Sequence, residues 1–171
     1  MAFTCNTTYN SRALAAMSRV VRKTVRVKVN RCAKLFSWLI IVLCLLCACI
    51  SWEEPWIAAS DAVVAVLLLL INWKEDAING FFARRRAMPG METASAAFYP
   101  DYYEVRIAGA VTQWQYSKVL VLAETGDYVV FALGKNYAQA FEKAGLEGGT
   151  EEEFRRWLEE KTGKQMRKIG R

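Results

Sequence analysis

Apolar residues gather in two long runs in the first half of the chain, and few polar positions interrupt them. The first run, LFSWLIIVLCLLCACISW, covers residues 35–52 and contains no charged residue. The second run, PWIAASDAVVAVLLLLINW, covers residues 55–73 and contains one charged residue, Asp61. A helix of eighteen residues is about 27 Å long, close to the ~30 Å hydrocarbon core of a bilayer. The pattern therefore predicts two transmembrane helices.

The segment between the runs is so short that it predicts a tight helical hairpin over residues 35–73. Its turn holds Glu53 and Glu54, and Pro55 suits the first turn of the second helix, where the missing N–H costs nothing. Adjacent carboxylates on such a turn seldom converge on one cation, so we favour a role in topology. Four tryptophans lie at or near the run ends, where their rings favour the headgroup layer: Trp38, Trp52, Trp56 and Trp73.

Basic residues flank the two runs on the side away from the glutamates. Residues 1–34 contain eight basic residues and no acidic one, although the whole chain has a formal charge of only +6. By the positive-inside rule, this asymmetry places both termini in the cytoplasm and the turn outside. The residues that we assign as topology determinants are Arg22, Lys23, Arg26, Lys28, Arg31, Lys34, Arg84, Arg85 and Arg86.

Asp61 is the candidate intramembrane polar site. An aspartate at a helix centre costs roughly 2.5–3.5 kcal/mol on insertion scales, and such residues often mark ion or proton paths. Asp61 falls about one and a half turns from the outer end of its helix, where the cost is smaller. Ser37, Ser51, Ser60 or a second subunit could supply its partner. A transport role stays open, and we favour a tolerated or helix-packing role.

Residues 1–34 predict a short strand and a basic juxtamembrane helix. The strand is expected near residues 2–8, which are rich in β-formers, and the helix from residue 11 onwards. The helix is amphipathic, and its apolar positions share one face: Leu14, Met17, Val21 and Val25. It is expected to lie on an anionic leaflet or to dock on the soluble part of the protein. The VRVKV segment at residues 25–29 also alternates as a strand would, so its structure stays open.

Downstream of the second run, residues 74–91 predict a helical exit and a linker that ends near Pro89. Residues 92–171 then show short alternating runs separated by turn signals, which predict an antiparallel meander. The expected strands are TASAAFY, YYEVRIA, VTQWQY, KVLVLAE, YVVFAL and YAQAFEK.

The last predicted element is a helix with clear end signals. Thr150 and Glu153 form a capping box, and Gly163 marks the stop. Glu151 and Arg155 are spaced for a favourable i,i+4 ion pair. An apolar stripe on this helix is expected to cover the sheet: Phe154, Trp157 and Leu158. We expect the basic tail KQMRKIGR to be solvated.

The composition argues against catalysis. The chain has no histidine, so a Cys/His zinc site and every histidine-dependent catalytic arrangement are excluded. Of its five cysteines, three lie inside the first apolar run, where small packing residues are expected. The soluble part has no glycine-rich phosphate loop and no clustered carboxylates. We therefore predict no enzyme, and assign no catalytic residue, no cofactor-binding residue, no cofactor and no metal ligand.

Three stretches between Phe98 and Gly163 resemble the YcxB-like family of bacterial membrane proteins: FYPDYYEVR, WQYSKVLVLAETGDYVVFALGKNYAQAFEK and EEEFRRWLEEKTG. The resemblance implies a cytoplasmic domain of pleckstrin-homology-like type, in which the strand near residues 2–8 joins six later strands and one helix follows. It also implies that the hairpin is inserted between the first and second strands. The family has no established activity, so no site residue is carried over.

The expected fold class is α+β, with a two-helix transmembrane hairpin and an antiparallel β domain of about seven strands that a C-terminal helix closes. We expect a multi-pass protein of the bacterial inner membrane with both termini cytoplasmic, acting as a non-enzymatic interaction or regulatory module. The expected partners are the lipid bilayer and either a protein or anionic lipid headgroups, with a homo-oligomer left open and no nucleic acid. The alternative function is a subunit of a small oligomeric transporter or pore that uses Asp61.

Overall fold

The first strand of the chain pairs with a strand that follows both long helices. In the computed structural model, β1 (Phe3–Thr8) runs antiparallel to β2 (Thr93–Phe98), and all six residues of each strand are paired. The backbone N–H of Tyr9 donates to the carbonyl oxygen of Glu92 at 2.7 Å, so pairing continues to the point where the chain leaves the sheet. The helical hairpin is therefore an insertion between two neighbouring strands, as the resemblance implied.

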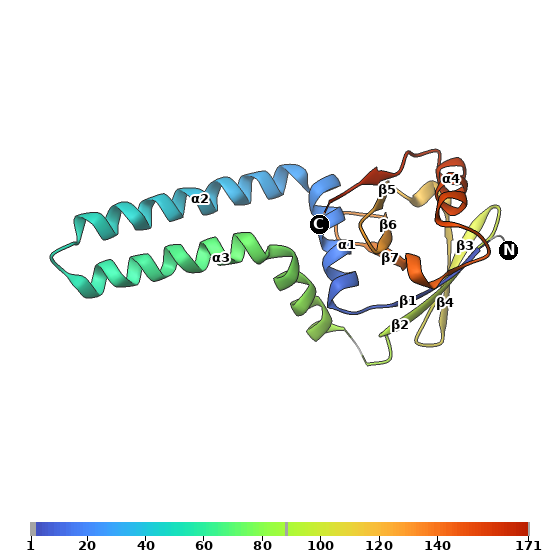
Figure 1. Cartoon of the computed structure of the whole chain (residues 1–171), viewed down its shortest axis with the longest axis horizontal. Helices are drawn as coiled ribbons and strands as arrows, with labels where there is room; N and C mark the ends of the chain where they lie inside the picture. The colour runs from blue at the N-terminus through green and yellow to red at the C-terminus, as the bar shows by residue number, and fades with distance from the viewer. Residues whose placement is uncertain (1–2, 88, 171) are drawn as a thin grey trace.

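The structure describes residues 3–87 and 89–170, so residue 2 of the expected first strand lies outside the described residues. Figure 1 shows α2 and α3 as a long antiparallel pair that projects from the β domain, with α1 at the junction. The bounds of these helices are Ser11–Thr24 for α1, Val27–Ile50 for α2 and Pro55–Arg86 for α3.

Local signals fix the ends of these helices. The side-chain oxygen of Asn10 accepts hydrogen bonds from two backbone N–H groups of the first turn of α1, and Pro55 opens α3. The ambiguous VRVKV segment is helical from Val27 onwards. Lys74 has non-helical dihedral angles, and α3 bends there (Figure 1), which turns its last turns towards α1.

The six predicted strands are present, and they divide between two sheets. The first sheet has the order β4-β3-β2-β1-β8, and the second has the order β7-β6-β5-β9. The break falls at a short 3-10 turn, Tyr116–Lys118, where the Tyr116 hydroxyl donates to the carbonyl oxygen of Tyr99 at 2.9 Å. The remaining bounds are β3 (Tyr102–Ile107), β4 (Ala110–Gln115), β5 (Val121–Glu124), β6 (Tyr128–Ala132), β7 (Ala138–Glu142), β8 (Leu146–Glu147) and β9 (Arg167–Lys168).

An aromatic core lies between the sheets and the last helix, α4 (Glu151–Thr162). The Phe98 ring lies 4.9 Å from that of Phe154 and 5.2 Å from that of Phe141, with edge-to-face geometry. The capping box of Thr150 and Glu153 is confirmed, so α4 begins at the predicted point and places its apolar stripe over this core.

Strand β6 is buried on both faces. Val129 and Phe131 point into the aromatic core, whereas Tyr128 and Val130 pack on the opposite side with α1. A strand that is buried on both faces has apolar residues at successive positions. This explains why apolar and polar residues do not alternate in YVVFAL. The second sheet is therefore sandwiched between the core and α1.

Two expectations for the C-terminal region are wrong. The basic tail is docked, because Met166 and Ile169 are buried and β9 pairs in parallel with β5. Arg155 does not pair with Glu151, and its guanidinium lies 3.6 Å from the carboxylate of Glu124 on β5. Arg155 also lies 3.9 Å from Glu159, so its partners are a residue of the second sheet and a residue one turn later on α4.

Helix α1 docks on the β domain and on the end of α3. The sequence left open whether it lies on an anionic leaflet or docks on the soluble part of the protein, and the structure shows the docked position. Its buried residues pack on the second sheet: Ala13, Ala16, Val20 and Val21. On α3, Gly80 is buried against α1, and a Cβ at that position would collide with the carbonyl oxygen of Ser11 and lie 2.9 Å from the Cβ of Ala15. A side chain at position 80 would therefore separate the two helices.

We expect Gly80→Ala to lower the free energy of unfolding by about 1–3 kcal/mol, because the added methyl overpacks the α1–α3 contact. The intrinsic preference of a helix for alanine over glycine, about 0.5–1 kcal/mol, acts in the opposite direction. The measurement is thermal unfolding of the full chain in detergent. Gly134→Ala is the control, because a Cβ there meets nothing closer than 4.0 Å. Equal unfolding temperatures for the two variants would show that α1 and α3 are not in close contact.

Candidate functional site: the groove at the base of the hairpin

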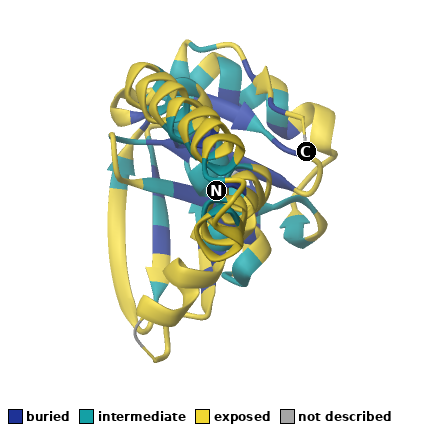
Figure 2. Cartoon of the chain, turned by 90° about the vertical axis from the view of Figure 1, so that its left-hand side faces the viewer, coloured by how far each residue is buried: buried dark blue, intermediate teal, exposed yellow. Residues whose placement is uncertain are grey.

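Two helices are long and apolar enough to cross a membrane. Helices α2 and α3 have apolar windows of mean hydropathy 2.5 and 1.9, and only 6% of each window is buried within the protein. Figure 2 shows both helices as mostly exposed. Where they face each other, Ile41 and Ala65 are buried, and the Asn72 amide donates to the Ser37 hydroxyl at 2.7 Å. The hairpin therefore has a narrow internal seam and a broad apolar surface.

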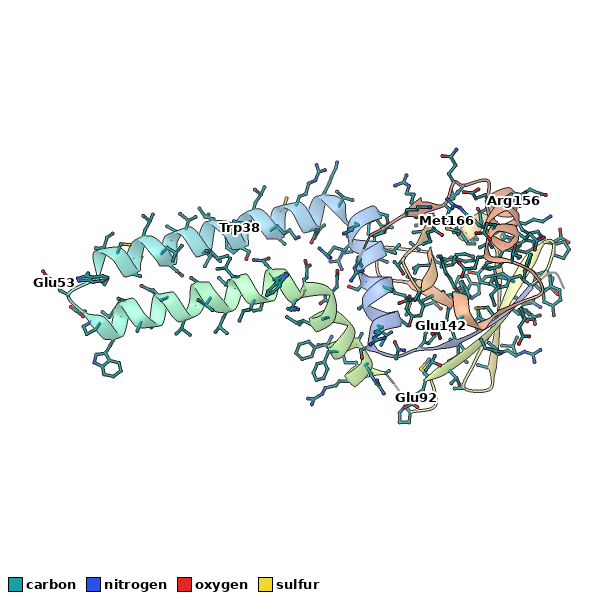
Figure 3. All side chains as sticks on the ribbon, viewed as in Figure 1. Trp38, Glu53, Glu92, Glu142, Arg156 and Met166 are labelled. Carbon is teal, nitrogen blue, oxygen red and sulfur yellow. The ribbon has the colours of Figure 1, made fainter. Side chains whose placement is uncertain are left out.

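The two ends of the hairpin differ in charge. Glu53 lies at the tip (Figure 3), and Trp52 and Trp56, close to it in the chain, have exposed side chains. The nine basic residues assigned from the sequence all lie at the opposite end, on α1, just before or within the first turns of α2, or in the last turns of α3. Positive charge therefore gathers where the hairpin meets the β domain.

An ion-pair network fixes the angle at which the hairpin leaves the domain. Asp76, just past the bend in α3, accepts hydrogen bonds from Arg19 at 2.8 Å and from Arg22 at 2.6 Å. Arg22 also lies 2.8 Å from Glu75, and Lys34 of α2 lies 3.9 Å from the same carboxylate. The network joins α1, α2 and α3. It also shows that Arg22 forms ion pairs within the protein, which the sequence could not indicate.

These contacts set the pKa of Asp76, which lies beyond the bend and outside the apolar segment. Burial alone would raise the pKa of this carboxyl. The hydrogen bonds and charges of Arg19 and Arg22 outweigh burial, and hold the pKa below its ordinary value of 3.8. Asp76 therefore stays ionised at neutral pH.

A groove of about 660 Å³ lies beside this network. Its walls come from α1, the first turns of α2, the last turns of α3 and the loop between β6 and β7. Among the described residues, one carboxylate lines it, and that is Glu75 of the network. Four basic residues line it: Arg22, Arg26, Arg86 and Lys135. We call this feature the junction groove.

Three of these bases have no acidic partner. Arg26, Arg86 and Lys135 form no ion pair with the described carboxylates, and Arg26 donates only a long hydrogen bond, 3.4 Å, to Asn136. The Nε atom of Arg22 is buried and has no hydrogen-bond partner among the described residues. The junction groove therefore offers cationic donors that the protein itself leaves unused.

The groove is also lined by apolar side chains. Leu14, Met17 and Val21 come from α1, and Val29 and Ala33 come from α2, next to the point where the apolar run begins. Uncommitted bases beside an apolar wall match a ligand that has an anionic group and a hydrocarbon part. Among the described residues, no cluster of cysteine and carboxylate side chains is arranged to hold a metal ion.

Asp61 lies apart from this groove, in the second turn of α3 near the tip. Its side chain is half-buried and has no hydrogen bond or ion pair with the described residues. Two of the serines considered as partners are engaged elsewhere, since Ser37 accepts from Asn72 and Ser60 donates to the Ile57 carbonyl oxygen. The role of Asp61 stays a prediction.

Comparisons with family models, curated proteins and solved structures found no match to this chain. The resemblance to the YcxB-like family therefore stays a prediction. Sequence reasoning named Arg22, Arg26 and Arg86 as topology determinants and missed that they meet Lys135. Arg22 and Arg26 are four residues apart, but Arg86 and Lys135 are far from them in the chain, and no local pattern connects the four.

We expect Asp76→Asn to lower the free energy of unfolding by about 2 kcal/mol, since it leaves the largely buried guanidinium of Arg19 without its carboxylate and that of Arg22 with Glu75 alone. The folded-state pKa of Asp76 is depressed, so its contribution is present above about pH 4 and is lost as the pH falls below that value. Unfolding in detergent at pH 7 and pH 3 measures both effects, and the difference between wild type and variant is expected to shrink at pH 3.

The matched control is Glu160→Gln, which removes the exposed partner of Lys161, 4.0 Å away. An exposed pair of this kind contributes at most about 1 kcal/mol. If Glu160→Gln destabilises the protein as much as Asp76→Asn, the network does not hold the hairpin.

Proposed function

We propose that this protein is a membrane-anchored, non-enzymatic interaction module of the bacterial inner membrane, with its β domain and both termini in the cytoplasm. The observation that carries the proposal is the apolar surface of α2 and α3, which is exposed on all sides except the narrow seam and has basic residues at the domain end only. The inserted segments are residues 35–52 and 55–73.

An aqueous environment does not suit this surface. Contiguous apolar patches of more than a few hundred Å² are rare on soluble monomers. Each buried leucine, isoleucine or valine side chain contributes about 1.5–3 kcal/mol relative to exposure. Many such side chains on the hairpin are half exposed or more: Leu35, Leu39, Leu43, Leu45, Leu46, Ile50, Val63, Val66, Leu67 and Ile71. Transfer of the hairpin into a bilayer removes this cost.

The exposed side chains of α3 after the bend support the proposal that the β domain lies against the membrane surface. Gly80 faces α1, and the exposed side chains include Phe81 and Phe82, at 49% and 52% exposure. Three arginines follow at residues 84–86, and the Arg85 guanidinium lies 4.9 Å from the Phe81 ring centre. Exposed aromatic rings next to basic residues are typical of a helix that lies in the interface between headgroups and water.

The β domain supports an interaction role. Two sheets of five and four strands enclose an aromatic core, and α4 covers it, an arrangement that fits a pleckstrin-homology-like type. The edge strand β4 is exposed along most of its length. With no catalytic cluster assigned, we propose that the domain binds a protein or anionic lipid headgroups at the cytoplasmic surface.

Membrane topology tests this proposal. Four cysteines are first changed to alanine, at positions 32, 44, 47 and 49, and single cysteines are then introduced by Glu53→Cys at the tip and Gln113→Cys on β4. An impermeant thiol reagent added to intact bacterial cells is expected to label Glu53→Cys. It is expected to label Gln113→Cys only after permeabilisation, because the bilayer separates the two ends.

The parent with no introduced cysteine is the control for the remaining buried Cys5. Labelling of Gln113→Cys in intact cells would overturn the orientation. Release of the protein from membranes by carbonate would overturn insertion itself.

A further inference from the structure

The junction groove has more positive charge than the protein neutralises. Its lining side chains comprise four bases and one carboxylate, an excess of three positive charges. The one carboxylate, Glu75, is already 2.8 Å from Arg22, so it leaves Arg26, Arg86 and Lys135 uncompensated. Like charges brought together in a groove repel one another, and an anion bound there relieves the repulsion.

The uncompensated bases come from three separate parts of the fold. Arg26 immediately precedes α2, Arg86 ends α3, and Lys135 lies in the loop between β6 and β7. Three asparagines also line the groove, at positions 30, 79 and 136. A phosphate accepts several charge-assisted hydrogen bonds at once, and amide N–H groups suit its oxygens or neighbouring hydroxyls. The donor set therefore fits a phosphate ester.

The position of the groove favours a lipid over a soluble phosphate ester. Val29 and Ala33 continue its wall along α2 towards Leu35, where the proposed membrane segment begins. A headgroup in the groove would leave its acyl chains beside the apolar surface of the hairpin, within the bilayer. A soluble ligand would leave that apolar wall in contact with water.

We propose that the junction groove binds the phosphate headgroup of an anionic phospholipid from the cytoplasmic leaflet. This inference rests on the proposed membrane insertion and adds the site and its ligand class. The bound headgroup contacts α1, both long helices and the β domain. It therefore fixes the orientation of the domain on the membrane and couples that orientation to the anionic lipid content of the leaflet.

The test measures lipid binding to the full chain by native mass spectrometry in a neutral detergent, with phosphatidylglycerol as the anionic probe and phosphatidylcholine as the zwitterionic probe. We expect one saturable phosphatidylglycerol site. The double variant Arg26→Gln/Lys135→Gln is expected to weaken it by about tenfold, because it removes two of the charged donors. Both side chains are exposed, so the variant is expected to fold.

The matched control is Arg84→Gln/Arg85→Gln, which removes the same charge from the end of α3 at residues that do not line the groove. Its affinity for phosphatidylglycerol is expected to change by less than about twofold. The single variant Lys135→Gln, in a loop, provides a second measurement if the double variant unfolds. An equal loss in both double variants would overturn the proposal, since it would show binding by diffuse surface charge.

Further measurements distinguish an anionic phospholipid from other ligands. Equal binding of phosphatidylcholine and phosphatidylglycerol would overturn an anionic site. Displacement of phosphatidylglycerol by equimolar glycerol 3-phosphate would show that the groove selects a soluble phosphate ester. The cysteine-labelling experiment reports insertion independently, so a protein that inserts as a hairpin but has no saturable lipid site would overturn this inference and leave the proposed function standing.

Discussion

The pairing of β1 with β2 is the constraint on which the rest of the structure depends. These two strands are central in their sheet, yet the chain between them contains α1 and the whole hairpin. The chain must leave the sheet and return to it at one point, where Tyr9 and Glu92 are hydrogen bonded. Both ends of the insertion are therefore held at one corner of the β domain, and the hairpin projects from there as a single unit (Figure 1).

Two further contacts fix the angle between the hairpin and the β domain. Helix α1 covers the outer face of the second sheet, and Gly80 allows α3 to approach it closely. Asp76 then ties α3 to Arg19 and Arg22 of α1 through short, largely buried ion pairs. Charge and close packing act at the same joint, because the bend at Lys74 brings the acidic residues of α3 alongside the basic face of α1.

The junction groove follows from this joint. Three helices and one loop converge there, and the ion-pair network takes up Arg19, Arg22 and both carboxylates while leaving Arg26, Arg86 and Lys135 without partners. Three residues that the sequence analysis assigned as topology determinants, Arg22, Arg26 and Arg86, thus line the groove together with Lys135. In the function that we propose, this site lies where the β domain meets the lipid surface.

The sequence by itself determined the elements whose signals are local. The two apolar runs, the capping box at Thr150 and the six principal strands all follow from period, length and turn chemistry within short windows. Only the tertiary structure decided the division into two sheets, the docking of α1 and of the C-terminal tail, and the partner of Arg155. The two-residue strands β8 and β9 are too short to show a period, and they exist because a neighbouring strand offers unpaired backbone groups. The junction groove depends in the same way on residues from distant segments, which meet only after the insertion closes on β1 and β2.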